Sequence, residues 1–491
     1  MVITRQALVV SCLLTLLLGF GVGPRPALAS LALREAGSPD AAKIRTAAKE
    51  LSNWVTKQNG KLSLYVGPAN SSEAIAAVNA DQPLNPASNT KLLTIATALH
   101  ELGSGFRFRT SLCGRIAADS IDTLGLVSNG DPTLDRPAML DLAFQLVQQH
   151  VRQVKRIIVD QSAFDSNFTP PAFEQQPNEW SPFRAPVSAV AFNDNSVSVF
   201  ISPTEPTKAV SVSAFPPSFL DLVVTARTRR AEEKAASLEV IPSSTNHRLK
   251  LRVTGGLQET AAPVTLFRRI DDPTTFAGYA LADSLRALGV QLPSSIVIEP
   301  GKCEAAAEIA FRTSPALGTL VHQLGKDSDN FVAEMLVKAV GAHATGKPGT
   351  TADGLAVIRE FSNKIHPLAN GTRLQNGSGL FDANRISAEQ LAAVLRFALE
   401  NPQFGPEFVS SLAVAGSDGT LKKRLASAPF GAIRAKTGSL KQVTSLSGYL
   451  QPPSMANGFV FSVIINDVDA IETAKRKVDE FLLLVLNSTH E

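Results

Sequence analysis

The sequence carries little net charge and lacks the residue clusters that mark several specialised protein classes. Its formal charge is +3 over 491 residues, with 47 Lys and Arg against 44 Asp and Glu. This balance provides no basic footprint for binding nucleic acid. The seven histidines form no tight ligand cluster that would indicate a metal site, and no cofactor is expected. With 44% hydrophobic and 19% charged residues, the chain is also unlike disordered or collagen-like sequences.

Cysteine is scarce, which limits the possible cross-links. Of the three cysteines, Cys12 falls in an N-terminal apolar stretch, so a mature chain would keep only Cys113 and Cys303. In an oxidising compartment such a pair can form a disulfide, and two separate thiols are an equal alternative. If the bridge forms, we predict that it ties together the two ends of an inserted domain.

The N-terminus has the pattern of a secretory signal over residues 1–29. Arg5 precedes an apolar run, and Ala27-Leu28-Ala29 forms a small-x-small cleavage site before Ser30. The run is short for a spanning helix of about 20 residues, so a retained membrane anchor is the lesser alternative. We therefore expect an exported protein that keeps no transmembrane anchor after cleavage.

Hydrophobic periodicity predicts a multi-domain α/β protein, and the length suits about three domains. Residues 30–104 and 305–491 are expected to form one domain, a sheet with helices around it. An α/β insert is expected over residues 105–194 and 257–304, and it carries a small β domain at 195–256. Helices are predicted at residues 41–58, 88–102, 139–154, 274–288, 315–324, 331–340, 355–361 and 471–486, and strands include 62–66, 433–440, 443–450 and 459–465. Ser387 and Gln390 predict a capping box at a further helix start.

The central motif is Ser88-Asn89-Thr90-Lys91, which begins an apolar helical run ending at Gly103. Residues three apart share a helix face, so the Lys91 amine can lie beside the Ser88 hydroxyl. A serine becomes a nucleophile when a base removes its proton, and burial lowers the pKa of a lysine enough to make it that base. Taken alone, however, such a pair is more often an ordinary helix start.

Two other stretches offer matching chemistry. In the polar loop between two predicted helices, Ser328 can relay a proton and Asn330 can donate to an amide carbonyl. On a predicted strand, Lys436 and Thr437 offer a charge and a hydroxyl to a carboxylate, while Gly438 leaves room for substrate along the strand edge. Each stretch by itself would be a structural loop or an edge strand.

In this order, Ser-x-x-Lys, Ser-Asp-Asn and Lys-Thr-Gly are the three motifs of the penicillin-recognising serine enzymes. The 240 positions from Ser88 to Ser328 leave room for the predicted inserts. The sequence resembles the class C penicillin-binding proteins of the D-alanyl-D-alanine carboxypeptidase/endopeptidase type over nearly the whole mature chain. The resemblance also rests on stretches at residues 130–134, 192–195, 376–380 and 416–421.

The resemblance implies a transpeptidase-like domain with an antiparallel sheet flanked by helices, and acyl transfer on peptidoglycan stem peptides in the periplasm. Ser88 would attack the penultimate D-alanine with Lys91 as base, and β-lactams would acylate the same serine. The backbone N–H groups of Ser88 and Ser439 would form the oxyanion hole. Lys436 and Thr437 would hold the terminal carboxylate, and Ser328 would pass the proton to the leaving D-alanine.

The sequence departs from the family at two positions, and two alternative functions stay open. Asp165 is the candidate for an acidic residue that holds a diamino acid in some members, and Asn376 stands where the family often has Asp. A β-lactamase or esterase on the same scaffold is one alternative, although no Glu-x-x-x-Asn deacylation loop is evident. A non-catalytic cell-wall binding protein is the other, and the intact motifs argue against it.

Overall fold

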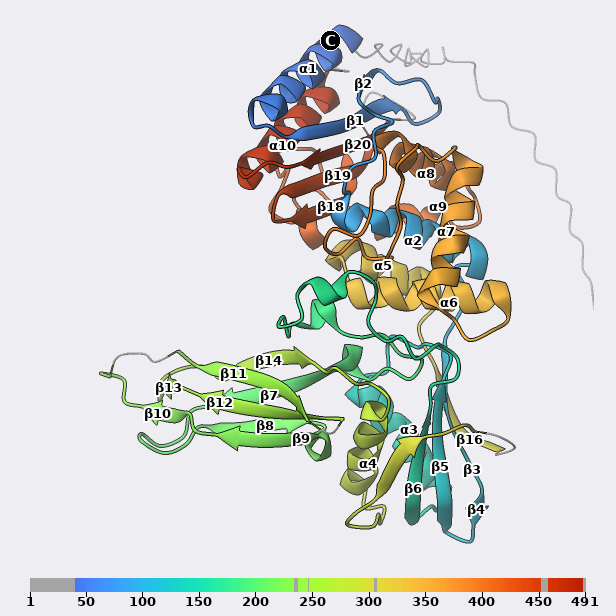
Figure 1. The fold of residues 1–491 in the computed structure, drawn as a ribbon, viewed down its shortest axis with the longest axis vertical. Coiled ribbons are helices and arrows are strands. Elements are labelled where there is room, and N and C mark those ends of the chain that lie inside the picture. Colours follow the sequence, from blue (N-terminus) through green and yellow to red (C-terminus); the bar gives the residue numbers. More distant parts are fainter. Residues whose placement is uncertain (1–39, 234–236, 246, 304–306, 452–457, 489–491) are drawn as a thin grey trace, which may run out of the picture. The chain divides into compact units, whose positions relative to one another are not determined.

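The computed structural model describes residues 40–233, 237–245, 247–303, 307–451 and 458–488 (Figure 1). The secretory signal expected at residues 1–29 lies outside the described residues. Across the ranges that the structure describes, none of the helices combines the length and apolar character needed to cross a membrane.

Both ends of the chain contribute to one antiparallel sheet with strand order β17-β18-β19-β20-β1-β2. Strand β1 pairs with β20 from Lys61 opposite Asn466 to Pro68 opposite Phe459. The strands are β1 (Lys61–Pro68), β2 (Ala76–Val78), β17 (Ala413–Val414), β18 (Ile433–Leu440), β19 (Val443–Leu450) and β20 (Phe459–Asn466). The sequence pattern predicted an alternating β1, but β1 is buried from Leu62 to Gly67, because helices cover both faces of the sheet.

The helices around this sheet form two layers (Figure 1). On one face lie α1 (Ala41–Lys57) and α10 (Ile471–Asn487), and α8 (Ala388–Glu400) packs on the other face. Asp40 caps α1 by accepting from the N–H groups of Ala42 and Lys43. Beyond α8, α2 (Lys91–Leu102) is surrounded by α5 (Leu317–Asp327), α6 (Asn330–Thr345), α7 (Thr351–Ile365) and α9 (Gly405–Ser411).

A second sheet, of order β15-β6-β5-β3-β16, forms the insert together with two helices. Its elements are β3 (Arg109–Gly114), β4 (Ile116–Ala117), β5 (Ser120–Ser128), α3 (Arg136–Gln148), β6 (Gln153–Asp160), α4 (Phe276–Ala287), β15 (Val297–Pro300) and β16 (Ala307–Thr313). Strands β5, β6 and β15 run parallel, as an α/β pattern requires. Helix α3 ends at Gln148, six residues before the predicted end at Val154, because His150 adopts a left-handed conformation with φ of 62°.

The insert carries a small β region, whose short strands pair in both antiparallel and parallel directions. Its strands are β7 (Ser196–Ser202), β8 (Ser211–Phe215), β9 (Leu220–Val224), β10 (Arg227–Arg229), β11 (Glu239–Thr245), β12 (Arg248–Thr254), β13 (Gly256–Gln258) and β14 (Val264–Arg269). The predicted fold class is therefore confirmed. The domain boundaries stay predictions. Strand β14 follows the boundary expected at residue 256 but pairs with β7 of the small β region, and β16 follows the boundary expected at residue 304 but pairs with β3 of the insert.

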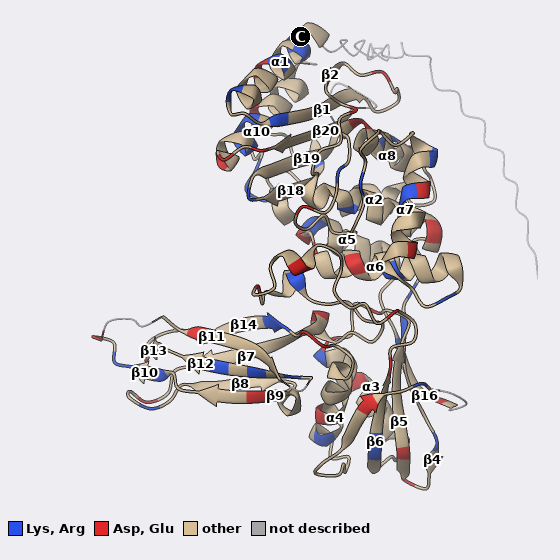
Figure 2. Cartoon of the chain, viewed as in Figure 1, with Lys and Arg blue, Asp and Glu red and all other residues tan. Residues whose placement is uncertain are grey.

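Cys113 on β3 and Cys303, just after β15, form a disulfide with a Cα–Cα distance of 6.2 Å. The bond joins positions near the start and the end of the expected insert. A side chain at Gly125 on β5 would collide with both sulfur atoms, so the glycine makes space for the bond. Lys and Arg are interspersed with Asp and Glu along the helices and strands of both sheets (Figure 2).

Candidate active site

Ser88 lies on a short 3-10 turn, η1 (Ala87–Thr90), that runs directly into α2. The sequence predicted a helix from Ser88 onward, whereas the α-helix begins at Lys91. In a 3-10 turn, residues three apart eclipse each other, which brings the Lys91 side chain over Ser88. The Lys91 Nζ to Ser88 Oγ distance is 2.9 Å.

Three oxygen atoms surround the buried amino group of Lys91. Besides Ser88 Oγ, they are Asn330 Oδ1 and the Ser378 carbonyl oxygen, each 2.7 Å from Nζ. Burial lowers the pKa of Lys91 to about 7, although the charges of Glu334 and Asp329 act to raise it. A neutral amine has two N–H donors and one lone pair. If it donates to Asn330 and Ser378, its lone pair faces the Ser88 hydroxyl, as a general base requires.

The turn between α5 and α6 presents Ser328 and Asn330. Ser328 ends α5 in a left-handed conformation with φ of 63°, and Asp329 caps α6 by accepting from the Val332 N–H at 3.0 Å. Asn330 thus begins α6 with its side chain toward Lys91, and its Nδ2 donates to the Phe183 carbonyl at 3.0 Å. The amide of Asn330 therefore joins Lys91 to the insert.

Lys436 is buried on β18 and meets Ser328. Its Nζ donates to Ser328 Oγ at 2.8 Å and to the Thr437 carbonyl at 2.9 Å. Burial, with a smaller effect of the nearby Lys91, lowers the pKa of Lys436 well below its usual range. The structure therefore brings Ser88, Lys91, Asn330, Ser328 and Lys436 into two adjoining hydrogen-bonded groups, although they come from three separate parts of the chain.

The edge of β18 carries Thr437 and Ser439. The Ile433 carbonyl accepts from Ala415 N–H on the β17 side, whereas the Ala432 carbonyl accepts from Gln451 N–H on the β19 side. The backbone N–H and C=O groups of successive residues in a strand point to opposite edges. Those of Thr437 and Ser439 therefore point to the same edge as those of Ile433. Both residues come after Ala435, the last residue of β18 that pairs with β17. The Thr437 hydroxyl donates to Thr420 Oγ1 at 2.8 Å. Their roles in substrate binding stay predictions.

The structure gives Gly438 a packing role, and its predicted role beside a substrate stays a prediction. A Cβ at this position would lie 2.6 Å from the Pro86 carbonyl oxygen and 3.0 Å from the Ala87 Cβ, so the absent side chain makes room for the turn that bears Ser88. Ser445 Oγ on the neighbouring strand β19 also donates to the Pro86 carbonyl at 2.6 Å. The glycine therefore allows β18 to approach η1 closely.

Sequence reasoning missed Glu334 and the loop that it holds. Glu334 is buried on α6, and its carboxylate accepts from the N–H groups of Gly377 at 3.1 Å and Ser378 at 2.7 Å. Its position four residues after Asn330, on the same helix face, is the signal that could have indicated it. Asn376 is buried in the same loop, where its Oδ1 accepts from Gly379 N–H at 2.9 Å. The Asn376 amide thus helps to hold this loop.

Asp165 does not line the group around Lys91. Its Oδ1 accepts from Nζ of the buried Lys338 at 2.6 Å, and the Asn167 carbonyl accepts from the same ammonium at 2.9 Å. A residue that already pairs with an internal lysine is poorly suited to hold the amino group of a substrate. The structure thus gives Asp165 a structural ion pair between α6 and the insert.

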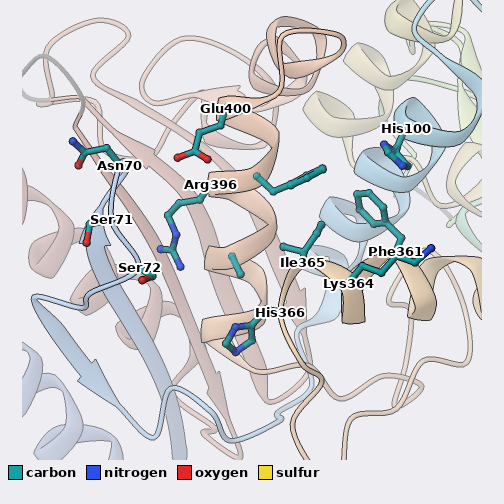
Figure 3. A pocket seen from close by; sticks show the side chains of 12 residues that line it. Asn70, Ser71, Ser72, His100, Phe361, Lys364, Ile365, His366, Arg396 and Glu400 are labelled. Atoms are coloured by element: carbon teal, nitrogen blue, oxygen red, sulfur yellow. The ribbon is translucent and has the colours of Figure 1, made fainter.

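A cavity of about 590 Å³ lies among α2, α7, α8 and the β1–β2 loop (Figure 3). Its wall includes the aromatic rings of His100 and Phe361, whose centroids are 5.0 Å apart, and the side chain of Arg396. None of the residues predicted to carry chemistry lines it.

Comparisons with known proteins agree with one another. The family model described as D-Ala-D-Ala carboxypeptidase 3 (S13) family matches residues 47–484. A D-alanyl-D-alanine carboxypeptidase of Actinomadura sp. (strain R39) is 30% identical over 419 residues, which cover 80% of this chain and 75% of the relative. D-alanyl-D-alanine carboxypeptidase DacB of Haemophilus influenzae is 26% identical over 78% of this chain and 80% of the relative. The crystal structure of penicillin binding protein 4 from Haemophilus influenzae has the same fold, with a TM-score of 0.72 and 23% identity over 89% of this chain and 98% of that one.

Proposed function

The chain belongs to the D-Ala-D-Ala carboxypeptidase 3 (S13) family, and from this premise we propose that it is a serine D-Ala-D-Ala carboxypeptidase with Ser88 as its nucleophile. Its substrates are peptidoglycan stem peptides that end in D-Ala-D-Ala, and β-lactams acylate the same serine. The periplasm is the proposed compartment. DD-endopeptidase activity is part of the proposal and rests on the sequence resemblance to the carboxypeptidase/endopeptidase type.

The observation that carries this proposal is the hydrogen-bonded group of Ser88 and Lys91. The Ser88 hydroxyl lies 2.9 Å from an amine whose pKa is lowered to about 7 by burial. Lys91 takes the Ser88 proton as Ser88 Oγ forms a bond with the carbonyl carbon of the penultimate D-alanine. The resulting oxyanion accepts hydrogen bonds from the backbone N–H groups of Ser88 and Ser439.

The second half of the reaction needs a proton on the leaving nitrogen. Ser328 relays the proton that Lys91 took from Ser88 to this nitrogen as the C–N bond breaks, and Lys436 supports Ser328 through the 2.8 Å hydrogen bond to its hydroxyl. D-alanine leaves, and an acyl ester on Ser88 remains. Water then attacks the ester carbon as Lys91 accepts a proton from it, and the bond between that carbon and Ser88 Oγ breaks as Lys91 returns the proton to Oγ, which releases the shortened peptide.

The proposal is tested by incubating the mature protein with a fluorescent penicillin and locating the label by peptide mass spectrometry. Label on the peptide that contains Ser88 is expected, and it should be absent from a Ser88→Ala variant. Release of D-alanine from a synthetic pentapeptide should disappear in the same variant. If the folded wild type takes up no label but still binds cell walls, a non-catalytic binding protein is the better description. If it takes up label and hydrolyses penicillin rapidly, it is a β-lactamase.

A further inference from the structure

We infer that Glu334 is a positioning residue that fixes the Ser378 carbonyl against Lys91 and, through its charge, sets the pH range over which Lys91 acts as a base. This inference rests on the proposed function, because it concerns how the base of that reaction is held. Glu334 lies one helical turn after Asn330, on the same face of α6. Asn330 contacts Lys91 directly, and Glu334 contacts it through Ser378.

Ser378 connects Glu334 with Lys91 through one hydrogen bond at its N–H group and another at its carbonyl. Both carboxylate oxygens of Glu334 are occupied, Oε1 by Ser378 N–H and Oε2 by Gly377 N–H. The peptide that contains the Ser378 carbonyl follows directly, and that carbonyl accepts from Lys91 Nζ at 2.7 Å. Because Glu334 is only 1% exposed, water cannot replace the carboxylate without rearrangement of the loop.

The loop has little room to move. Side chains at Gly377 and Gly379 would collide with Val337 on α6 and with the Ala87 carbonyl on η1, so the loop is wedged between these two elements. Gly379 also has a left-handed φ of 76°. A loop in such close contact transmits a change at Glu334 to the position of the Ser378 carbonyl.

The charges around Lys91 determine the sign of the electrostatic effect. Glu334 and Asp329, both from the region of α6, raise the pKa of Lys91, and Lys436 on β18 is the neighbouring cation. Glu334 in turn interacts electrostatically with two cations, Lys91 and Lys338. Burial raises the pKa of Glu334, and the hydrogen bonds from Gly377 and Ser378, with the charge of Lys91, act against that shift and favour the anion. Removal of that anion favours the neutral amine, so Lys91 loses its proton at a lower pH.

The test compares Glu334→Gln with Lys338→Met, which removes another buried charge one turn further along α6. The rate of Ser88 acylation by a fluorescent penicillin is measured from about pH 5 to about pH 9, with melting temperatures as a check of folding. In Glu334→Gln we expect the acylation rate to begin its increase with pH at a lower pH than in the wild type. We also expect the maximum rate at high pH to fall by up to about a hundredfold, as for a misplaced base. Lys338→Met should have a lower melting temperature, but its acylation rate should not begin to increase at a lower pH.

A third variant, Glu334→Asp, separates position from charge. It keeps the negative charge on a shorter side chain. We therefore expect a lower maximum acylation rate, while the pH at which the rate increases stays close to that of the wild type. It also provides a test if Glu334→Gln does not fold, since a wild-type maximum rate in Glu334→Asp overturns the positioning role. A labelled wild type with no shift in Glu334→Gln overturns this inference alone. An unlabelled wild type overturns the proposed function and this inference with it.

Discussion

At Lys91, the direction of the lone pair matters as much as the pKa. The amine is buried, and the two acceptors at 2.7 Å, Asn330 Oδ1 and the Ser378 carbonyl, occupy both N–H groups of its neutral form. Rotation of the amine would break one of these bonds. In the proposed mechanism the remaining lone pair is directed at Ser88 Oγ, so the base needs no reorganisation before it acts.

The pKa of Lys91 leads to a prediction about pH. Below about 7 the amine carries a proton and cannot accept another, whereas above about 7 it is neutral and can take the Ser88 proton. We therefore expect the acylation rate of Ser88 to rise with pH through about 7, measured with a fluorescent penicillin in a rapid-quench experiment. A rate that stays flat across this range in the wild type would contradict the assignment of the base.

Substitution of the base provides a matched comparison. An arginine keeps its proton at all these pH values, so Lys91→Arg should slow acylation by roughly 10²–10⁴-fold. Lys364→Arg makes the same chemical change at a side chain that is 71% exposed and lies on α7. That control should acylate like the wild type, and equal losses in both variants would argue against a specific role for Lys91.

The sequence was sufficient to predict the five clustered residues because each has a side chain with distinctive chemistry in a short motif. It was not sufficient for the partners of Lys91 that act through the backbone. The Ser378 carbonyl looks like any other peptide oxygen in a sequence, and its approach to Lys91 depends on tertiary packing. Glu334 was missed because a single acidic residue in a helix is usually exposed.

At the scale of elements, the proposed oxyanion hole requires η1 and β18 to approach each other, because Ser88 lies on η1 and Ser439 on β18. Asn89 reinforces this contact, because its amide donates to the Lys436 carbonyl at 2.8 Å and accepts from Ser447 Oγ at 2.7 Å when oriented to satisfy both partners. The position of β18 relative to η1 thus depends on short polar side chains that bind backbone carbonyl groups, together with the space that Gly438 leaves.

Gly438→Ala should disturb this contact. The added methyl group would push against the Pro86 carbonyl, so we expect a loss of about 1–3 kcal/mol in the free energy of unfolding, as for other overpacked sites. Acylation should slow as well, because β18 and Ser439 move away from Ser88. Chemical denaturation and penicillin labelling measure the two effects.

Gly105→Ala is the control for that experiment. A Cβ at Gly105 would meet no atom within 4 Å, so this variant should keep both stability and labelling. If Gly438→Ala instead labelled as fast as Gly105→Ala, the close approach of β18 to η1 would not matter for the reaction.

Elements with strong patterns were predicted well, and those that depend on tertiary pairing were not. Strands β18, β19 and β20 and helix α10 have long apolar or amphipathic patterns and appear within a few residues of their predicted bounds. Strand β16 was missed because it becomes a strand by pairing with β3. At the start of α8, Ser387 caps Gln390 N–H as predicted, but the Gln390 side chain donates to the Ser362 carbonyl instead of completing the capping box.

At the scale of the whole molecule, the disulfide closes a very long loop. Cys113 and Cys303 are 190 residues apart in sequence, so the bond strongly restricts the unfolded chain. We predict that the double variant Cys113→Ser, Cys303→Ser unfolds with a free energy lower by roughly 2–5 kcal/mol. Thermal and chemical denaturation measure this loss.

Reduction of the wild type is the matching control. It should lower stability to a similar extent, while penicillin labelling at low temperature persists in both proteins because neither cysteine belongs to the group around Ser88. Unchanged stability on reduction, with free thiols confirmed by titration, would mean that the bond contributes nothing to folding.

The pairing of β1 with β20 sets an order of events in the life of the polypeptide. Lys61 lies opposite Asn466, so the sheet is complete only when nearly all of the chain has been made. Ser88 leaves the ribosome hundreds of residues before Lys436 and the strand edge that it needs. A chain that stops before β18 therefore carries a serine without its partners, and hydrolytic activity requires that the strands from β18 to β20 have been made and that β1 has paired with β20.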